Sequence, residues 1–256
     1  MSRAATMARG PSPAQLRLIS FVSLLAIWEV TALLLQSREL PDLVQVASTF
    51  YIELVDGPLL SDLGITLFRV IVAFVLAMVI GSAIGILMGF NRGLDHLFDG
   101  WLILFLNIPA LVTIILCLLW FGINEVSFIV AVALNKIPNV AVTLREGARA
   151  IDRDLLQVAE LFRVGRRKTF FRFFLPQLYP YLMAAGRSGV ALIWKIVLVV
   201  ELIGGSNGIG FRMMTFFQYF DIAGLLAYTM AFVIVMLVVE MALVEPLERR
   251  MTRWRA

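Results

Sequence analysis

The sequence is poor in the residue types that build disulfide frameworks, metal centres and charged surfaces. Among 256 residues it has one cysteine and one histidine, and only 16% of its residues are charged. A single cysteine excludes a disulfide framework and any zinc site built from several cysteines. A single histidine excludes a metal centre built from a histidine cluster. We therefore expect no bound metal.

Motifs for enzymatic chemistry are also missing. The sequence has no GxxxxGK[ST] phosphate loop, no HExxH, no GxSxG and no CxxC. The glycine-rich segment 204–210 follows an apolar run, so we interpret it as a turn-rich loop and not as a nucleotide cradle. A membrane-embedded enzyme would need catalytic groups clustered at one depth, and the charged residues show no such spacing. We expect no enzymatic activity, no cofactor and no nucleic-acid partner.

Apolar residues dominate what is present. They make up 61% of the chain, and the mean hydropathy is +0.91. A soluble domain is about 45–50% apolar and about 25% charged, and a disordered chain needs low hydrophobicity. The composition therefore indicates an integral membrane protein.

The apolar residues form continuous runs and do not alternate with polar ones, which favours helices over a β-barrel. A bilayer core requires roughly 20 apolar residues per helix. We predict an all-α membrane bundle with about six transmembrane helices within 16–245, and cytoplasmic tails at 1–15 and 246–256. The first span is too long for a removable signal peptide and acts as a signal anchor. The predicted spans are 16–36, 65–90, 101–121, 126–144, 181–204 and 224–245.

Basic residues set the orientation, because short cytoplasmic loops are enriched in lysine and arginine. They gather in both tails and in the segment 145–180, whereas the opposite side is mostly acidic and receives only Arg38, Arg69 and Arg212. We therefore predict a multi-pass protein with both termini in the cytoplasm. The basic residues of 145–180 are Arg145, Arg149, Arg153, Arg163, Arg166, Arg167, Lys168 and Arg172.

The segment 38–64 between the first two spans has a helical apolar pattern on the predicted outer side. Its apolar residues recur at a spacing of three to four, which predicts a short interfacial helix. They are Leu43, Val46, Phe50 and Leu54.

Three glycines lie along one face of the second span. Gly81, Gly85 and Gly89 form GxxxGxxxG, a spacing that lets a neighbouring helix approach closely. Packing within the chain and a contact with another subunit both fit this pattern, with internal packing the simpler reading.

Two prolines fall inside predicted spans, Pro109 in the third and Pro138 in the fourth. Each removes a backbone hydrogen bond, and Asn107 and Asn135 lie close to them. These positions indicate either simple kinks or bends that line a solute pathway.

Charged residues inside the spans are costly and usually face a bundle interior or a wet cavity. Lys136 and Lys195 lie near the middle of the fourth and fifth spans. A spacing of seven residues places three polar or aromatic side chains on one stripe of the fifth span, namely Arg187, Trp194 and Glu201. This stripe lines either a polar pathway or a salt-bridged helix interface. Two lysines on a pathway would favour an anionic solute, but pairing with Glu29 or Glu201 would remove that argument.

The segment 145–180 is longer than a simple connection needs. Leu155, Leu156, Ala159 and Phe162 predict one apolar face of a short amphipathic helix. Such a face needs a partner, either the membrane surface or a docked cytoplasmic protein.

This segment resembles the EAA loop of ABC-importer permeases, whose pattern is E-A-A-x3-G-x9-I-x-L-P. Here Gln157-Val158-Ala159 stands for E-A-A, Arg163 for the glycine, and Phe173-x-Leu175-Pro176 for I-x-L-P. The spacing matches without a gap, although several residue types differ. Gly165 is a candidate to replace the missing glycine in the turn.

The resemblance extends along nearly the whole chain and is to the nitrate/sulfonate/taurine-type permeases. Its landmarks are Trp28-Glu29, Leu40-Pro41, Gly81, Gly85, Gly89, Asn91-Arg92, Ile108-Pro109, Trp120-Phe121-Gly122, Leu175-Pro176, Trp194, Glu201, Gly208-Ile209-Gly210 and Glu248-Arg249-Arg250.

The resemblance implies a type I ABC-importer permease in a bacterial inner membrane. Such permeases pair with a second permease subunit, identical or different, and with two cytoplasmic ATPase subunits that bind the ATP. A periplasmic or lipid-anchored binding protein delivers the solute. The implied ATPase-coupling residues are Gln157, Val158, Ala159, Glu160, Phe162, Arg163, Val164, Gly165, Leu175 and Pro176.

Relatives of this type carry nitrate, bicarbonate, sulfonates, taurine or aromatic acids, and others carry neutral vitamin precursors. Lys136 and Lys195 favour an anion. A secondary transporter is the alternative outside the family, but we find no internal repeat of the kind such transporters usually show.

Overall fold

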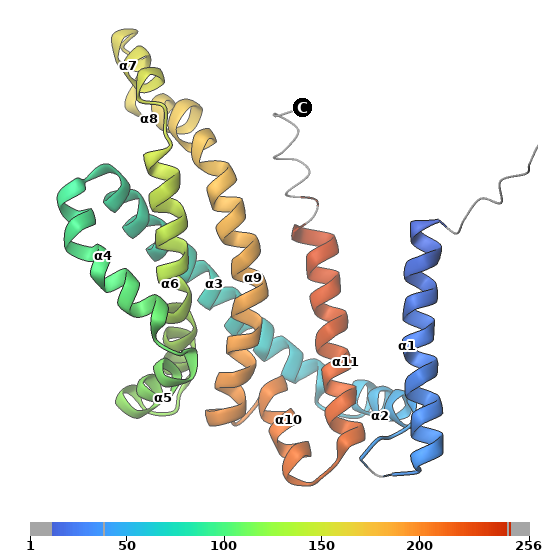
Figure 1. Cartoon of the computed structure of the whole chain (residues 1–256). Helices are drawn as coiled ribbons and strands as arrows, with labels where there is room; N and C mark the ends of the chain where they lie inside the picture. The colour runs from blue at the N-terminus through green and yellow to red at the C-terminus, as the bar shows by residue number, and fades with distance from the viewer. Residues whose placement is uncertain (1–11, 38, 245, 247–256) are drawn as a thin grey trace, which may run out of the picture.

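A computed structural model describes residues 12–37, 39–244 and 246 of the chain (Figure 1). Within these residues the backbone forms helices and no strand, which confirms the predicted all-α class. The helices are α1 (Pro13–Leu35), α2 (Leu43–Val55), α3 (Leu59–Phe90), α4 (Arg92–Asn107), α5 (Ala110–Phe121), α6 (Glu125–Arg149), α7 (Arg153–Leu161), α8 (Arg166–Thr169), α9 (Leu175–Gly204), α10 (Ile209–Gln218) and α11 (Ile222–Val239), with π-helical turns η1 (Phe170–Phe174) and η2 (Glu240–Val244).

Four helical stretches of the described chain are long and apolar enough to cross a bilayer. They are α3, α6, the stretch Arg166–Gly204 that contains α9, and the stretch Ile222–Ala242 that contains α11. These correspond to the second, fourth, fifth and sixth predicted spans. The first predicted span corresponds to α1, whose described apolar part, Ile19–Leu35, is shorter than the other four.

The third predicted span, 101–121, is not one straight helix. It is divided between α4 and α5, which are bent by 98° relative to each other. Ile108 is extended, with φ −70° and ψ 124°, because the ring of Pro109 disfavours helical geometry in the preceding residue. Pro138, in contrast, lies inside α6, which continues through it.

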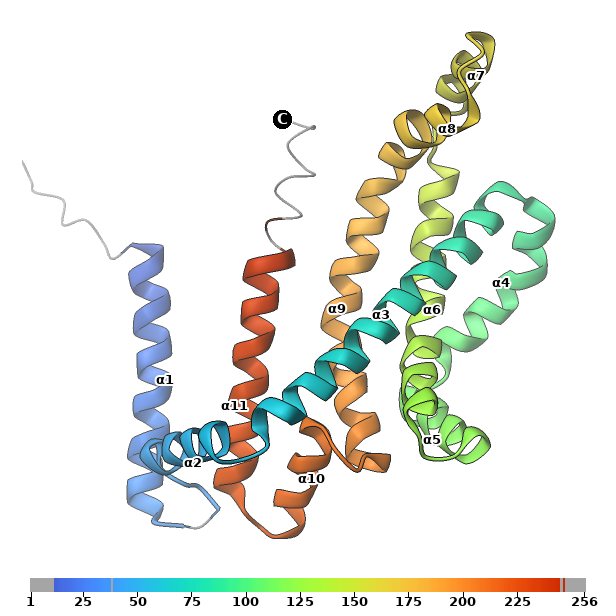
Figure 2. The same ribbon diagram turned by 180° about the vertical axis from the view of Figure 1, so that it is seen from behind.

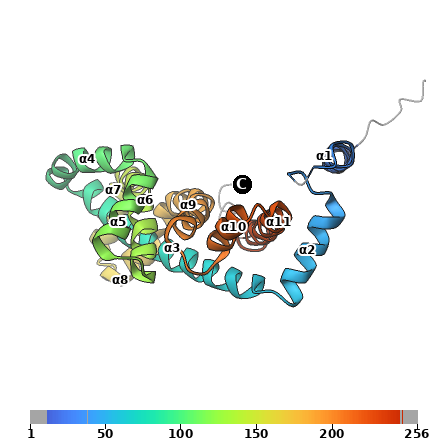
Figure 3. The ribbon, with the colours of Figure 1, turned by 90° about the horizontal axis from the view of Figure 1, so that it is seen from below.

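Side views show α7 and α8 projecting from one end of the bundle, and α2 and α10 at the opposite end (Figures 1 and 2). We call these the α7 end and the α2 end. The first turn of α1 and the last turn of α11 both lie towards the α7 end (Figure 1). Viewed along the bundle, α1 stands apart from the other long helices and is joined to them through α2 (Figure 3).

The predicted helix in 38–64 is confirmed as α2. Val46 is 1% exposed, and Phe50 and Leu54 pack against a buried cluster from α3, α10 and α11. Two hydrogen bonds join α1 to the start of α2. Trp28 Nε1 donates to the Pro41 carbonyl at 3.1 Å, and the Leu43 N–H donates to Glu29 Oε2 at 2.9 Å.

The glycine stripe of α3 packs against α6 of the same chain. A Cβ at Gly81 would lie 2.7 Å from Val140 Cβ, and one at Gly89 would lie 2.5 Å from Ala148 Cβ. At Gly85 the clash would be with the backbone of α6, at Ala141. The glycines therefore let these two spanning helices approach to backbone contact, as the internal-packing interpretation predicts.

We expect Gly85→Ala to lower the free energy of unfolding by about 1–3 kcal/mol, because the backbone of α6 must move to admit the methyl group. Gly64→Ala in the same helix is the matched control, since a Cβ there has nothing within 4 Å. The control should be neutral or gain about 0.5–1 kcal/mol from the higher helix propensity of alanine. Urea and thermal unfolding in detergent measure both, and equal stabilities would contradict the close packing.

Candidate functional site

The segment 145–180 is helical over most of its length. α6 continues to Arg149, α7 occupies Arg153–Leu161 and α9 begins at Leu175. The predicted short amphipathic helix is therefore present as α7. The connection between the spanning helices is shorter than the predicted loop because both of them extend into it.

The apolar face of α7 is divided in a way that the prediction did not foresee. Ala159 is buried, with 1% exposure, and Leu156 packs against the core cluster between α6 and α9. Leu155 and Phe162, predicted on the same face, are instead exposed by 45% and 77%. Leu161 is 83% exposed. α7 therefore packs against the bundle through Ala159 and Leu156. Other apolar side chains, Leu155, Leu161 and Phe162, form an apolar surface that faces outward.

Side-chain hydrogen bonds hold the first turn of α7 against α9. Asp152 Oδ1 caps the helix by accepting from the N–H groups of Asp154 and Leu155 at 2.9 and 3.4 Å. The Asp152 N–H donates to Gln177 Oε1 at 2.8 Å, and Gln177 Nε2 donates to the Phe173 carbonyl at 2.8 Å. The bond from Asp152 to Gln177 therefore links the first turn of α7 to the start of α9.

The backbone at the end of α7 shows why the EAA pattern has a glycine at the position that Arg163 occupies here. Arg163 adopts a left-handed conformation with φ 52°. Its N–H donates to the Glu160 carbonyl at 2.9 Å, and the Val164 N–H donates to the Ala159 carbonyl at 2.9 Å. These two bonds form a Schellman motif, in which the left-handed residue is usually glycine. Gly165 does not take over this turn, since its φ is −59°.

We expect Arg163→Gly to raise the free energy of unfolding of the α7 segment by up to about 1–2 kcal/mol, because a left-handed non-glycine residue is strained. Gly165→Ala is the control and should be tolerated, because its φ is ordinary and a Cβ there meets nothing within 4 Å. Hydrogen exchange of the α7 amides in detergent reports the local effect. Faster exchange in the Arg163→Gly variant than in the native chain would contradict this interpretation.

The remaining residues of the predicted coupling set lie on the outside of this unit or at its junction with α9. Pro176 is the second residue of α9, where a missing N–H is tolerated. Leu175 precedes it and is half-buried. The exposed members are Gln157, Val158, Glu160 and Gly165, and Val164 is half-buried.

The polar residues near the prolines bond within their own helices. Asn107 Nδ2 donates to the Ile103 carbonyl at 2.7 Å and is exposed. Asn135 Nδ2 donates to the Ala131 carbonyl at 2.9 Å and is half-buried. Within the part of the chain that the structure describes, no hydrogen bond joins the two asparagines.

The predicted stripe on α9 is not uniform. Trp194 and Glu201 are buried at 1% and 0% exposure, and Trp194 packs edge-on against Phe232 with ring centroids 5.3 Å apart. Arg187 is half-exposed, with Glu240 Oε1 at 3.5 Å. Seven residues fall about 20° short of two helical turns, so the buried seam of α9 drifts away from Arg187. Trp194 and Glu201 have the contacts of a helix interface.

The two predicted mid-span lysines have different surroundings. Lys136 on α6 is 3% exposed, and its Nζ donates to Ser188 Oγ on α9 at 3.2 Å. Lys195 on α9 is exposed. Among the described residues, neither ammonium group lies within ion-pair distance of a carboxylate, so Glu29 and Glu201 do not neutralise them.

Glu201 instead forms a buried ion pair with Arg69 of α3. Arg69 Nη1 donates to Glu201 Oε1 at 2.7 Å, and Thr66 Oγ1 lies 3.0 Å from the same oxygen. Arg69 Nε donates to Glu125 Oε2 at 2.8 Å, and its Nη2 also contacts Glu125. Arg69 Nη2 donates to Asn207 Oδ1 at 2.6 Å. Arg69 is only 2% exposed, so this arginine, which we counted from the sequence with the basic residues opposite the cytoplasm, belongs to a buried network.

The same network fixes the turn between α9 and α10. The Gly210 N–H donates to Glu201 Oε2 at 2.9 Å, and the Ile209 N–H donates to Thr66 Oγ1 at 3.0 Å. Gly208 has φ 97° and donates to Asp62 Oδ1 at 2.9 Å. A Cβ at Gly208 would lie 2.6 Å from Glu201 Oε1, so this glycine is required for the close approach of the turn.

The sequence contained a signal for this network that our reading did not use. Arg69 and Asp62 stand in one spanning helix and Glu201 in another, and opposite charges in apolar helices are expected to pair. Spacing alone could not reveal which partners meet, because the residues are 132 positions apart in the chain.

We expect Arg69→Met to lower the free energy of unfolding by about 3–5 kcal/mol, because it leaves the buried Glu201 carboxylate without its cation. The double variant Arg69→Met/Glu201→Gln should recover part of this loss. Glu146→Gln is the surface control, with 51% side-chain exposure in its pair with Arg149, and should cost under about 1 kcal/mol. Equal effects of the buried and surface variants on unfolding in detergent would refute the assignment.

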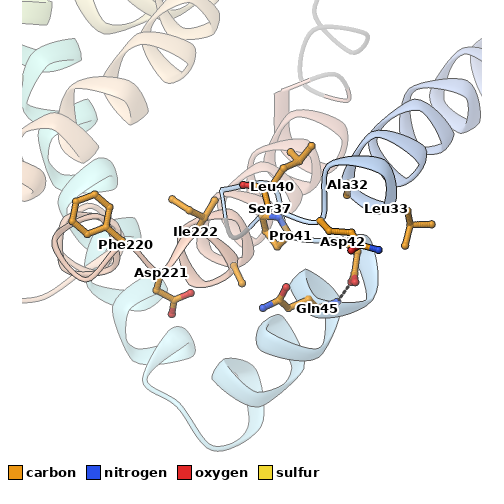
Figure 4. Close-up of a pocket in the computed structure, with 12 residues that line it drawn as sticks. Ala32, Leu33, Ser37, Leu40, Pro41, Asp42, Gln45, Phe220, Asp221 and Ile222 are labelled. Carbon is orange, nitrogen blue, oxygen red and sulfur yellow. Dashed lines mark hydrogen bonds between the residues drawn. The ribbon is translucent and has the colours of Figure 1, made fainter.

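A cavity of about 550 Å³ lies at the α2 end, between the end of α1, the start of α2 and the turn before α11 (Figure 4). Among the residues that the structure describes, its charged lining residues are Asp42 and Asp221. Both carboxylates cap helices, accepting from the N–H groups of Gln45 at 2.7 Å and Gly224 at 2.9 Å.

Comparison with known proteins identifies the family. Residues 77–253 match the family of binding-protein-dependent transport system inner membrane components, and the chain belongs to this family. It is a multi-pass membrane protein and an ABC-transporter permease of the nitrate/sulfonate/taurine type.

The relatives cover most of the chain. A putative aliphatic sulfonates transport permease of Bacillus subtilis is 30% identical over 91% of this chain and 84% of its own length. The taurine transport permease of Escherichia coli is 26% identical, over 78% and 72%. A nitrate import permease of Synechocystis is 27% identical, over 75% and 73%.

The fold agrees with a solved importer. The inward-facing MetNI methionine ABC transporter contains a chain that aligns with a TM-score of 0.64, over 76% of this chain and 96% of that one, at 18% identity. The chain therefore has the type I importer-permease fold, which the sequence predicted.

Proposed function

We propose that this permease imports a small anion across the bacterial inner membrane, with its α7 end in the cytoplasm. In this proposal, ATP is hydrolysed by separate ATPase subunits that dock on α7, and a binding protein delivers the solute to the α2 end. The observation that carries the coupling role is the outward apolar surface of α7, including Leu161 at 83% exposure. An apolar helix face that projects from a bundle needs a partner groove.

The orientation is supported by charge. The basic residues between α6 and α9 lie at the α7 end, and the first turn of α1 and last turn of α11 lie towards the same end (Figure 1). Short cytoplasmic loops are enriched in such residues. The α7 surface is then accessible to a cytoplasmic ATPase.

A second permease subunit, identical or related, completes the assembly in this proposal. α1 stands apart from the bundle (Figure 3) and exposes apolar side chains along its length, among them Ile27 at 65% and Leu34 at 80%. Lipid covers part of such a helix, and a neighbouring permease can cover the rest.

The anionic solute is supported by the relatives, whose names specify aliphatic sulfonates, taurine and nitrate. Each of these molecules carries an anionic oxygen group. A neutral vitamin precursor is the alternative solute, as carried by other members of the wider family. Lys136 and Lys195, without carboxylate partners in the described chain, favour the anion.

We expect Leu161→Asp to reduce ATPase co-purification from native membranes at least tenfold, because a carboxylate cannot enter an apolar groove without loss of solvation. Val44→Asp is the control, since Val44 is 73% exposed on α2 at the opposite end of the bundle. Mass spectrometry counts the ATPase per permease in each preparation. Undiminished ATPase with Leu161→Asp would argue against α7 as the docking element.

The solute class is tested by uptake into proteoliposomes that contain the whole transporter, ATP and the binding protein. We expect ATP-dependent uptake of ethanesulfonate, taurine or nitrate, and no uptake of riboflavin as the neutral probe. Uptake of riboflavin alone would assign the permease to the neutral class.

A further inference from the structure

Two mid-span cationic groups reach the same face of α9, and both lack a counter-ion in the described chain. Lys195 is exposed there directly. Lys136 is buried on α6 but donates its hydrogen bond at 3.2 Å to Ser188, which is exposed on α9. Ser188 Oγ in turn donates to the Ala185 carbonyl at 3.1 Å. The hydroxyl therefore connects the buried ammonium to the exposed face.

Ser188 and Lys195 stand on the same side of the helix. They are seven residues apart, which is close to two turns and about 10 Å along the axis. Side chains of a helix lean towards its N-terminus, so the lysine stem inclines towards Ser188. Ala191 and Leu192 lie between them and are both exposed, so the two polar positions share an exposed stripe of the helix.

The depth of Lys195 makes an unneutralised charge expensive. It lies nine residues before the end of α9 at Gly204, about 13 Å along the axis at 1.5 Å per residue. A charged side chain in the middle of a span is rare unless it faces a wet cavity or a partner of opposite charge. At this depth a lipid headgroup is not available to supply that charge.

The packing around Lys136 indicates a position built for a lysine. A Cβ at Gly189 would lie 3.2 Å from Lys136 Cε, so the glycine leaves room for the lysine stem between α6 and α9. The described structure gives this ammonium one hydrogen-bond acceptor, although it can donate three. Its positive charge therefore acts on the exposed face of α9 through the Ser188 hydroxyl.

We propose that Lys195 and the Lys136–Ser188 pair form the site that holds the anionic group of the solute during its passage through the membrane. This inference rests on the proposed function and names the residues that select the solute. Lys195 touches the anion directly. The Ser188 hydroxyl has one proton, which it donates to the Ala185 carbonyl in this structure, so it turns that proton to the anion when the solute binds, while Lys136 continues to donate to its oxygen. Charge-assisted hydrogen bonds to an oxyanion are about twice as strong as neutral ones, which gives the site its selectivity.

Uptake by the whole transporter in proteoliposomes tests the site, with ethanesulfonate and nitrate as probes. We expect Lys195→Ala to raise the apparent KM at least tenfold, Ser188→Ala to raise it less, and Lys195→Arg to retain most of the affinity. Val233→Ala, at an exposed apolar position of α11, should leave uptake unchanged. ATPase copies and permease dimer should be the same in all variants.

A second measurement tests accessibility without relying on turnover. In a Cys117→Ala background, Lys195→Cys should react with an anionic methanethiosulfonate reagent, and ethanesulfonate should slow the reaction. Val233→Cys should remain unlabelled. Absence of labelling at position 195, or labelling that ethanesulfonate does not slow, would overturn the site.

The outcomes separate the two proposals. If the native transporter takes up neither anion, the proposed solute class and the site both fail. If it takes up the anions and Lys195→Ala does so equally well, only the site fails. If Lys195→Ala dissociates the permease dimer, the counter-ion is a carboxylate of the second copy and the site is likewise overturned.

Discussion

The cost of a charge inside the bilayer is the constraint on which the arrangement of this chain depends. α3, α6 and α9 are apolar enough to span, yet each carries ionisable side chains away from its ends. Arg69 and Glu201 meet this cost by pairing with each other, while Arg69 also donates to the Asn207 carbonyl and Glu201 also accepts from the Gly210 N–H. The pair draws together α3, α9 and the turn to α10, so the order of the bundle at the α2 end follows from one electrostatic requirement.

The α7 end is organised by packing and helix capping. α7 is fixed to α9 by Asp152 and Gln177, and it contacts the cluster between α6 and α9 through Leu156. Lys136 lies on α6 and Lys195 lies on α9, the two helices that α7 contacts. In the proposed assembly, a force that an ATPase applies to α7 acts on the two helices that hold the proposed anion site.

Local sequence signals predicted much of this structure. The apolar period of α2 and the glycine spacing of α3 were sufficient, because each depends on residues three or four apart. The 98° bend between α4 and α5 was missed because an apolar run continues across the helix break. Pro109 marks the position of the bend in the sequence. The outward turn of Leu155 and Phe162 was missed because periodicity defines a face but not its partner. The partners of Arg69 were missed because pairing over long separations is not visible in a single sequence.

The long separation of Arg69 from its partners has a consequence for biogenesis. Glu125 and Glu201 are 56 and 132 residues downstream, and a ribosome adds about 5–20 residues per second. Roughly ten seconds therefore pass between synthesis of the arginine and arrival of its buried carboxylate. During that interval the charge of Arg69 lacks its buried carboxylate, so α3 cannot take its final position in the membrane. Its insertion must therefore be completed together with α9, late in translation.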